Sequence, residues 1–324
     1  MTYDYELFFG NPTGTVEHCI IEPTNRLREI AKKTKVALVF FIDVGYLKKM
    51  NEFIHFPKVK HEYELVTNQI KTLVKEGHDC QLHIHPHWED TIHDGESWIM
   101  DVTRYKLVDF EQQDIERIVQ DYQQILLNLT GKKVDSFRAG GWCLQPFSKV
   151  KSAFEKANLL LDSTVFPKGK NVKGNYYYDF SKTPDKDHWQ FSEDICEEDI
   201  NGEFSEYPIS NYKYSVWFFW QLFLLGRLNP KDHKPMGDGY PMPSPGHKRE
   251  MLTKGKLLSA SVDGYFVTKL NAVIRRNTVK KFDHTVIIGH PKACTRFALA
   301  RLERFIRLQQ RRGNRFSTFA EIQK

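Results

Sequence analysis

The sequence has few of the features that hold very small or membrane-embedded proteins together. Its five cysteines are widely spaced among 324 residues and form no Cys-x-x-Cys pair. A cysteine-rich zinc module is therefore excluded, and a reducing compartment fits best. No apolar run reaches the length of a membrane span, and the first residues, TYDYELFF, carry no basic segment and no cleavage site. We therefore expect a cytoplasmic protein without a signal peptide.

The chain also has only a small excess of positive charge. The formal net charge is +6, and lysines and arginines are scattered until Arg296, after which arginines accumulate as far as Arg315. We interpret this stretch as a solvated helix face, with anionic lipid or nucleic acid as the alternative contact, and we expect no nucleic-acid partner. No internal repeat is found. The hydrophobic content of 40% is enough for a substantial core.

Short apolar runs alternate with amphipathic stretches along most of the chain, which is typical of βα units around a parallel sheet. Strands are predicted at 2–9, 36–43, 80–85, 135–138, 159–162 and 286–290, and helices after Pro23, around 66–74 and 115–129, and over 146–157. This pattern predicts a barrel-like α/β fold in a single domain over 1–324. Residues 166–256 break it with aromatic, proline and glycine clusters, and we expect them to form an insertion or lid.

Inside this insertion, residues 216–225 read VWFFWQLFLL, too short a run to span a bilayer. Core packing is the favoured interpretation. An interfacial membrane anchor and a hydrophobic wall for sugar rings are the alternatives. A segment at 202–209 would be a strand that brings Glu206 toward the pocket.

Three histidines leave the strand 80–85 in the sequence GHDCQLHIHPHW. His83 and His87 are four residues apart, and Pro86 helps the chain to turn, so both imidazoles can converge on one cation such as zinc. The alternative is a polar strand face without a ligand. His85 lies between them in the sequence.

The same stretch resembles the second motif of the polysaccharide deacetylase family, the NodB homology domain. Gly77, His78 and Asp79 match the start of that motif, and the resemblance implies that His83 and His87 bind a divalent metal. Counterparts of the other family motifs follow in the right order at predicted strand ends. The resemblance implies a distorted (β/α) barrel with about seven parallel strands.

Residues 2–6, TYDYE, resemble the first motif, which makes Asp4 the implied general base. Tyr5 stands where the family has a metal-binding aspartate. Residues two apart in a strand point the same way, so Glu6 is the expected third ligand, with Asp43 as a weaker rival. The alternative is that Asp4 and Glu6 are only a polar edge.

Residues 137–142, FRAGGW, resemble the third motif, in which Arg138 orients the catalytic aspartate. Gly140 lets the backbone approach closely. The resemblance implies that this stretch and the histidine stretch line the substrate pocket, through His85, Trp88, Gly141 and Trp142.

The fourth and fifth motifs correspond to Asp162 and to IGHP at 288–291. The resemblance implies that His290 is the general acid and that Asp162 tunes it. A turn cap at Asp162 and a core hydrogen-bond donor at His290 are the alternatives.

These roles together predict a metal-dependent hydrolase with zinc as its metal. The resemblance implies that it removes an N-acyl group from an amino sugar or surface-glycan precursor, with Asp4 taking the proton of the attacking water and His290 protonating the departing amine. A hydrolase of small non-sugar amides and a catalytically inactive carbohydrate-binding protein are the alternatives. Contact with a membrane is compatible with each of these and required by none.

Overall fold

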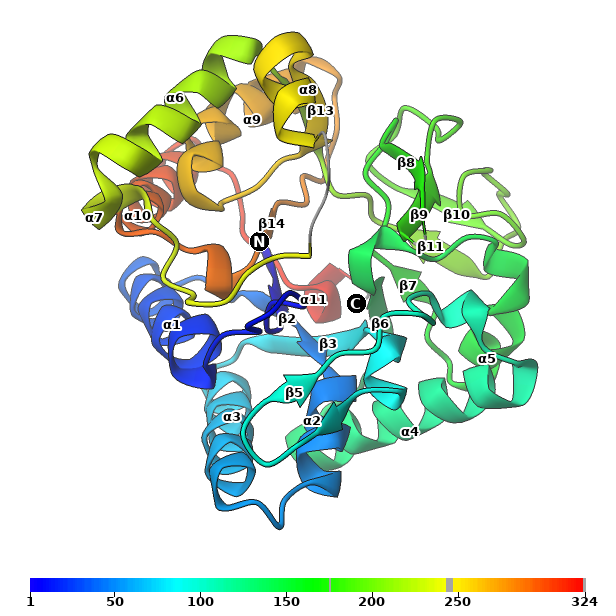
Figure 1. The fold of residues 1–324 in the computed structure, drawn as a ribbon. Helices are drawn as coiled ribbons and strands as arrows, with labels where there is room; N and C mark the ends of the chain where they lie inside the picture. The colour runs from blue at the N-terminus through cyan, green and yellow to red at the C-terminus, as the bar shows by residue number, and fades with distance from the viewer. Residues whose placement is uncertain (175, 243–246, 323–324) are drawn as a thin grey trace. The chain divides into compact units, whose positions relative to one another are not determined.

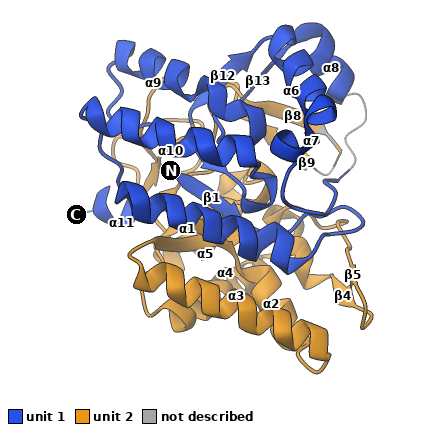
Figure 2. Cartoon of the chain, turned by 90° about the vertical axis from the view of Figure 1, so that its left-hand side faces the viewer, with its two compact units in different colours: residues 1–38, 210–324 blue, residues 39–209 orange. Residues whose placement is uncertain are grey.

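A computed structural model describes residues 1–174, 176–242 and 247–322. The chain forms two compact units: unit 1 comprises Met1–Leu38 and Ser210–Lys324, and unit 2 comprises Val39–Ile209 (Figure 2). The expected insertion 166–256 is divided between them at residue 210. Its residues 175 and 243–246, and the chain's residues 323–324, lie outside the described residues.

Unit 2 contains a sheet whose strands follow the order β10-β11-β7-β6-β3-β2, parallel except for β10. The strands are β2 (Val39–Asp43), β3 (Asp79–Ile84), β6 (Ser136–Ala139), β7 (Leu161–Asp162), β10 (Trp189–Phe191) and β11 (Phe204–Glu206). The helices are α2 (Val44–Glu52), α3 (Pro57–Lys75), α4 (Gln112–Thr130) and α5 (Lys151–Lys156). Two hairpins extend from it, β4 (Ile92–His93) with β5 (Trp98–Ile99), and β8 (Lys170–Lys173) with β9 (Tyr176–Asp179).

The local sequence explains these elements. Every residue of β2 and β3 is buried, which is typical of a parallel strand covered on both faces. Helix α4 buries residues at helical spacing, among them Ile115, Ile118 and Tyr122, and Gly131 ends it with a φ of 62° that glycine adopts without strain. Helices α2, α3 and α4 contact one another and β3 (Figure 1).

Unit 1 has a parallel pair of strands, β1 (Thr2–Tyr5) and β14 (Ile288–Gly289), in which Tyr3 is opposite Gly289. Strands β12 (Asn211–Tyr214) and β13 (Lys256–Ser259) form an antiparallel hairpin. The α-helices are α1 (Glu22–Thr34), α6 (Val216–Leu228), α7 (Pro230–His233), α8 (His247–Lys254), α9 (Leu270–Val279), α10 (Arg296–Arg311) and α11 (Phe319–Ile322).

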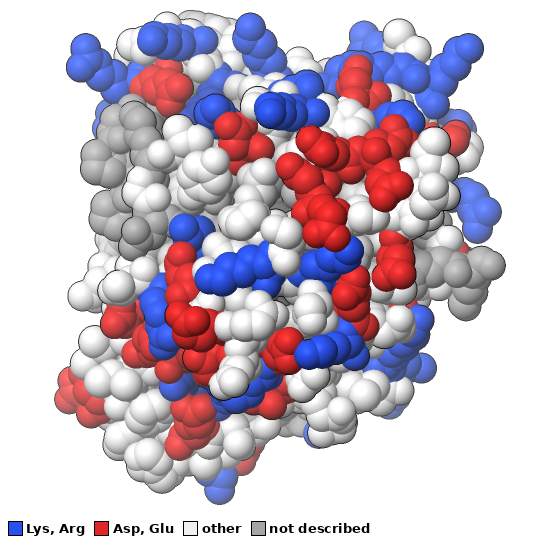
Figure 3. Space-filling model, turned by 90° about the vertical axis from the view of Figure 1, so that its right-hand side faces the viewer, with Lys and Arg blue, Asp and Glu red and all other residues white. Residues whose placement is uncertain are grey.

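The observed elements confirm the expected fold class, a distorted (β/α) barrel with about seven parallel strands. Five parallel strands belong to unit 2 and two to unit 1. The predicted strand 159–162 is shorter than expected, because only Leu161 and Asp162 pair with β6. On the face drawn in Figure 3, Lys and Arg are interspersed with Asp and Glu, and neither sign covers the surface. In the part of the chain that the structure describes, no helix combines the length and the apolar character that crossing a membrane requires.

Candidate active site

Unit 2 places three buried imidazoles in succession at the carboxyl end of β3. His83 is still in the strand, His85 follows it, and His87 lies in the 3-10 turn Pro86–Glu89. Their rings are close: the centroids of His83 and His85 are 4.7 Å apart, and those of His85 and His87 are 5.3 Å apart. The three residues are at most 2% exposed, so each imidazole has been withdrawn from water. Buried imidazoles at the carboxyl ends of parallel strands are suited to binding a metal.

One backbone carbonyl fixes the orientation of His83. Its Nδ1 lies 2.8 Å from the carbonyl oxygen of Arg138, the residue opposite His83 in the neighbouring strand β6. A carbonyl only accepts hydrogen bonds, so Nδ1 carries the hydrogen and Nε2 keeps its lone pair. Metal-binding histidines are commonly held in this way.

The Arg138 side chain is fully buried and is held in turn by the loop after β7. Its Nε donates to the carbonyl of Ser163 at 2.7 Å, and its Nη2 donates to the Ser163 hydroxyl at 3.1 Å. The guanidinium also lies 4.2 Å from the centre of the Phe41 ring. The carbonyl that orients His83 therefore belongs to a rigidly anchored residue.

Gly140, the second residue after Arg138, makes room for His85. A Cβ atom at this position would be 2.4 Å from His85 Nδ1, closer than any real contact. From the sequence, this glycine was expected to allow a close approach. The group that lies against it in unit 2 is the His85 imidazole. Gly141 and Trp142 both adopt a positive φ, 59° and 62°, which is uncommon for a tryptophan.

Aromatic side chains surround these histidines. The Tyr105 ring stacks on His87 at 5.4 Å between centroids and contacts the Tyr176 ring at 5.8 Å. Trp142, which is partly exposed, lies 6.3 Å from Tyr176. Tyr176 comes from the hairpin of β8 and β9, a part of the expected insertion. Tyr176 of the insertion thus joins Tyr105 and Trp142 in an aromatic wall beside the histidines.

Trp88, predicted as a substrate contact, is completely buried. Its indole nitrogen donates to Asp43 Oδ2 at 2.7 Å, and its ring is stacked 5.8 Å from that of His87. These contacts hold the loop that carries His87, and a role in substrate binding stays a prediction. Asp43, the weaker rival for the metal, accepts this hydrogen bond.

Unit 1 gathers a second group of predicted residues. Asp4 lies in β1, Glu6 follows it, and His290 directly follows β14, so the parallel pairing of the two strands brings them to the same end. His290 Nε2 lies 3.7 Å from Asp4 Oδ2 and 3.9 Å from Glu6 Oε1. Asp4 and Glu6 are each 5% exposed.

Two residues in this group were missed by the sequence analysis. Asp263 Oδ2 lies 2.8 Å from His290 Nδ1, and its Oδ1 accepts the His290 backbone N–H at 2.9 Å. Lys292 Nζ donates to Glu6 Oε1 at 2.8 Å, and Lys292 is itself buried. The only sequence signal for Asp263 was its place before Gly264 at the end of an apolar run. Lys292 follows the IGHP motif.

The pKa of His290 reflects these neighbours. Burial lowers it and is the largest single effect, but Asp263, Asp4 and Glu6 together more than offset it, so the pKa of His290 rises to about 9. The imidazole is therefore protonated at neutral pH and can donate a proton.

Asp162 has a different environment, in unit 2. Its Oδ1 accepts a hydrogen bond from the Thr164 hydroxyl at 2.6 Å, and it is opposite Glu206 in the β7–β11 pair. Burial raises the pKa of both carboxyls, and the charge of Asp162 raises that of Glu206 further. Both the charge of Asp162 and its hydrogen bond with Glu206 favour the protonated form of Glu206. The role of Asp162 as the residue that tunes His290 stays a prediction, while Asp263 is the carboxylate observed on His290 Nδ1.

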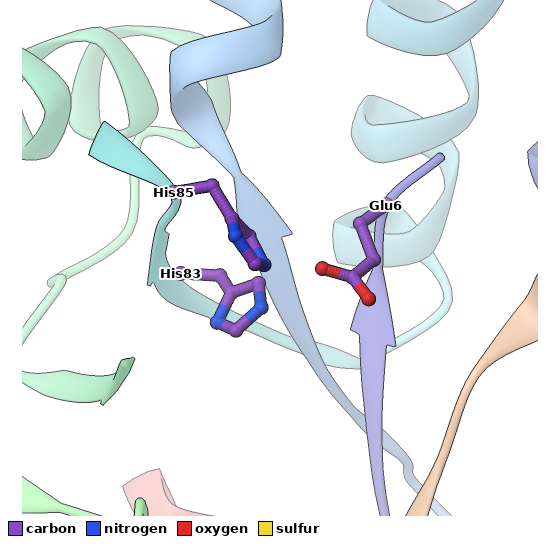
Figure 4. Close-up of side chains that lie close together, drawn as sticks. All are labelled: Glu6, His83 and His85. Carbon is purple, nitrogen blue, oxygen red and sulfur yellow. The ribbon is translucent and has the colours of Figure 1, made fainter. Parts of the chain in front are cut away.

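Figure 4 shows three of these side chains together with the elements that carry them. His83 and His85 extend to the same side of the chain at the end of β3, as strand alternation requires. Glu6 extends from the end of β1.

Sequence comparisons identify no relative: no known protein family and no curated protein matches the chain. Among solved structures, Puue allantoinase aligns over 99% of this chain and 87% of its own, with 11% identity and a TM-score of 0.51. This likeness is one of fold alone, and it agrees with the barrel class.

Two further solved structures have lower TM-scores. A Mycobacterium smegmatis protein described as a polysaccharide deacetylase gives 0.43, with 14% identity over 92% of this chain and 80% of its own. A Bacillus anthracis pseudoenzyme of the CE4 family gives 0.41, with 12% identity over 99% of this chain and 64% of its own. Polysaccharide deacetylases are therefore among the solved structures that align with this chain. Scores below 0.5 carry no argument about the function.

Proposed function

We propose that the protein is a metal-dependent hydrolase that removes an N-acyl group from an amino sugar. The observation that carries the proposal is the orientation of His83. Its Nδ1 hydrogen is held by the Arg138 carbonyl, which leaves Nε2 as a ligand atom among buried imidazoles.

The donor set suits a divalent transition metal, for which we propose zinc. Glu6, His83 and His85 are buried candidate ligands that offer one carboxylate oxygen and two imidazole nitrogens. The proposal places these three around one ion. The family resemblance favours His87 in place of His85, and the experiment below separates the two. When bound, such a metal supplies a Lewis acid that polarises the acyl carbonyl and lowers the pKa of water.

The remaining chemistry falls to residues of unit 1. Asp4 would take the proton of the water that attacks the acyl carbon. His290, protonated at neutral pH and held at Nδ1 by Asp263, would give a proton to the amine nitrogen as the C–N bond breaks. The products are a carboxylic acid and a free amino sugar.

The aromatic wall supports a sugar as the substrate. Trp142 and Tyr176 present partly exposed rings beside the buried histidines, and sugar rings pack their apolar faces on such surfaces. A nucleotide-linked, lipid-linked or free amino-sugar precursor of a surface glycan fits this arrangement, in a cytoplasmic setting.

Elemental analysis of protein purified without added metal tests the proposal. Wild type should contain about one equivalent of a divalent transition metal. A His83→Ala, His85→Ala variant should lose it, and a His83→Ala, His87→Ala variant shows whether His87 takes part. His61→Ala, at an exposed helical position, is the matched control. Metal-loaded protein is then screened against acetylated amino sugars and against small non-sugar amides.

The ion pair of Lys292 with Glu6 favours a second candidate function. A buried ammonium already neutralises the Glu6 carboxylate, which weakens its attraction for a metal ion. If no metal binds even after zinc is added, the hydrolase proposal fails, and a carbohydrate-binding protein without catalysis becomes the better conclusion. Measured binding of amino sugars by metal-free protein would support that candidate.

A further inference from the structure

Helix α6, the VWFFWQLFLLGRL segment of unit 1, has two apolar faces. Its inner face supplies Phe218 and Phe219, which are buried at 1% and 0% exposure and pack with Tyr214. Core packing was the favoured interpretation of this run, and it holds for this face. The outer face carries four large apolar side chains that unit 1 does not cover.

These four side chains form a single stripe. Trp217, Trp220, Leu224 and Leu228 follow at spacings of three, four and four residues, which places them on one side of a helix. Their exposed fractions are 68%, 45%, 44% and 79%. Single exposed apolar residues are common on proteins, but a contiguous stripe with two tryptophans is typical of a binding surface.

Cationic side chains outnumber acidic ones on helix α6 and in the segments next to it. No acidic residue lies between Val216 and Leu228, and Arg227 on the helix is exposed. Helix α8 contacts α6 in unit 1 (Figure 2), and Lys248 Nζ lies 4.9 Å from the Phe223 ring of α6. Other exposed cations close by in the sequence are Lys231, Lys234, Arg249 and Lys254. The acidic residues in these helices are Asp232, which accepts from Asn229, and Glu250, which pairs with Lys256.

We propose that the outer face of α6 is a docking surface for an anionic lipid bilayer. Tryptophan favours the boundary between headgroups and acyl chains, and leucine favours the acyl side. Lysine and arginine beside them attract anionic headgroups. A helix of 13 residues is too short to cross a bilayer, so it lies in the plane of the interface.

The same charges disfavour a second copy of the chain as the occupant. In a two-fold contact through this stripe, the same patch meets itself. Helix α6 of each copy offers no carboxylate to pair with the other copy's Arg227, so the excess of like charge disfavours this contact. An anionic membrane surface satisfies the apolar and the cationic features together.

Co-sedimentation with lipid vesicles tests this inference, on full-length protein and without substrate. Vesicles of neutral phosphatidylcholine are compared with vesicles that contain about one-third anionic phosphatidylglycerol. Wild type should bind the anionic vesicles at least tenfold more tightly, and about 0.5 M salt should weaken that binding by screening. A Trp217→Ser, Trp220→Ser variant should lose about tenfold or more of it.

Matched variants separate the contributions. Ile92→Ser, Ile99→Ser removes two exposed apolar side chains from the β4–β5 hairpin of unit 2 and should bind like wild type. Arg227→Gln, Lys231→Gln should weaken binding to anionic vesicles and leave binding to neutral vesicles unchanged. All variants change exposed positions, so an unchanged unfolding midpoint confirms that each one is folded.

Wild type that stays in the supernatant with anionic vesicles at low salt would overturn the inference. So would equal binding by the Trp217→Ser, Trp220→Ser variant. A dimer in light scattering that this variant dissolves would identify a second copy as the occupant and also overturn it. Because no substrate or activity enters the measurement, its result stands whether or not the protein is a deacetylase.

Discussion

Asp263 Oδ2 and His290 Nδ1 are 2.8 Å apart, and the carboxylate makes the main contribution that keeps the imidazole protonated at neutral pH. We predict that Asp263→Asn lowers the pKa of His290 from about 9 toward its ordinary value, because the neutral amide no longer stabilises the imidazolium. NMR titration of the His290 ring in metal-free protein measures this shift. In the hydrolase, kcat should fall about 100-fold with little change in KM.

Asp283→Asn is the control for Asp263→Asn, since Asp283 is exposed in the same unit. It should leave both the titration and kcat unchanged. An unchanged His290 titration in Asp263→Asn would show that the carboxylate does not control the imidazole.

The barrel class and the helices α1, α3, α4, α5 and α10 could be predicted from the sequence, because they depend on local periodicity. Helix α4 has its apolar residues at helical spacing and a glycine at its end, and β3 is a short buried run that ends in histidines. The region 166–209 could not be predicted in detail. Its strands β8–β10 are three or four residues long, too short for a periodic pattern to stand out, whereas β11 lies inside the strand predicted at 202–209.

Contacts between residues far apart in the sequence could not be predicted, for a different reason. Lys292 and Glu6 are 286 positions apart and meet only because β1 pairs with β14. Asp263 was missed because a resemblance to a motif assigned its role to Asp162, whereas the pairing with His290 depends on the path of the chain between β13 and β14. Spacing and the motif favoured His83 and His87 as ligands, and they could not weigh His85 against His87, because the direction of each imidazole depends on where β3 ends.

Gly140 sets how closely the backbone approaches His85. We predict that Gly140→Ala lowers zinc affinity about tenfold or more, because the added Cβ would lie 2.4 Å from His85 Nδ1 and displace the ring. Competition with a chelator measures the affinity. Gly226→Ala, where a Cβ meets nothing within 4 Å, is the control. Equal affinity of Gly140→Ala and wild type would show that the His85 position does not matter for the metal.

Glu206 makes stability depend on pH. Burial and the charge of Asp162 raise its pKa well above the ordinary 4.5, so the folded protein keeps a proton that the unfolded chain releases. The contribution of this protonated carboxyl to the free energy of unfolding is therefore fully present below about pH 4.5 and is lost as pH rises toward the folded-state pKa. We predict that Glu206→Gln has a free energy of unfolding close to that of wild type in acid and ~1–3 kcal/mol higher at pH 8.

The glutamine can preserve the local hydrogen bonds, because Glu206 Oε1 accepts the Val165 backbone N–H and a carboxamide oxygen can do the same. Urea unfolding at several pH values measures the difference. Glu203→Gln, at an exposed position, should track wild type throughout. A Glu206→Gln protein that is less stable than wild type at pH 8 would mean that Glu206 is ionised in the fold.

Tyr176 tests whether the aromatic wall receives the sugar. Its ring contacts Tyr105 and Trp142, whereas the next residue, Tyr177, points to the other face of β9 and is 37% exposed. Stacking on an aromatic ring contributes ~0.5–1.5 kcal/mol, so Tyr176→Ala should raise KM about three- to tenfold at unchanged kcat. Tyr176→Phe keeps the ring and should restore KM, and Tyr177→Ala should leave it unchanged. If the two alanine variants have equal effects, the hairpin acts as a whole, and Tyr176 does not form a specific contact with the substrate.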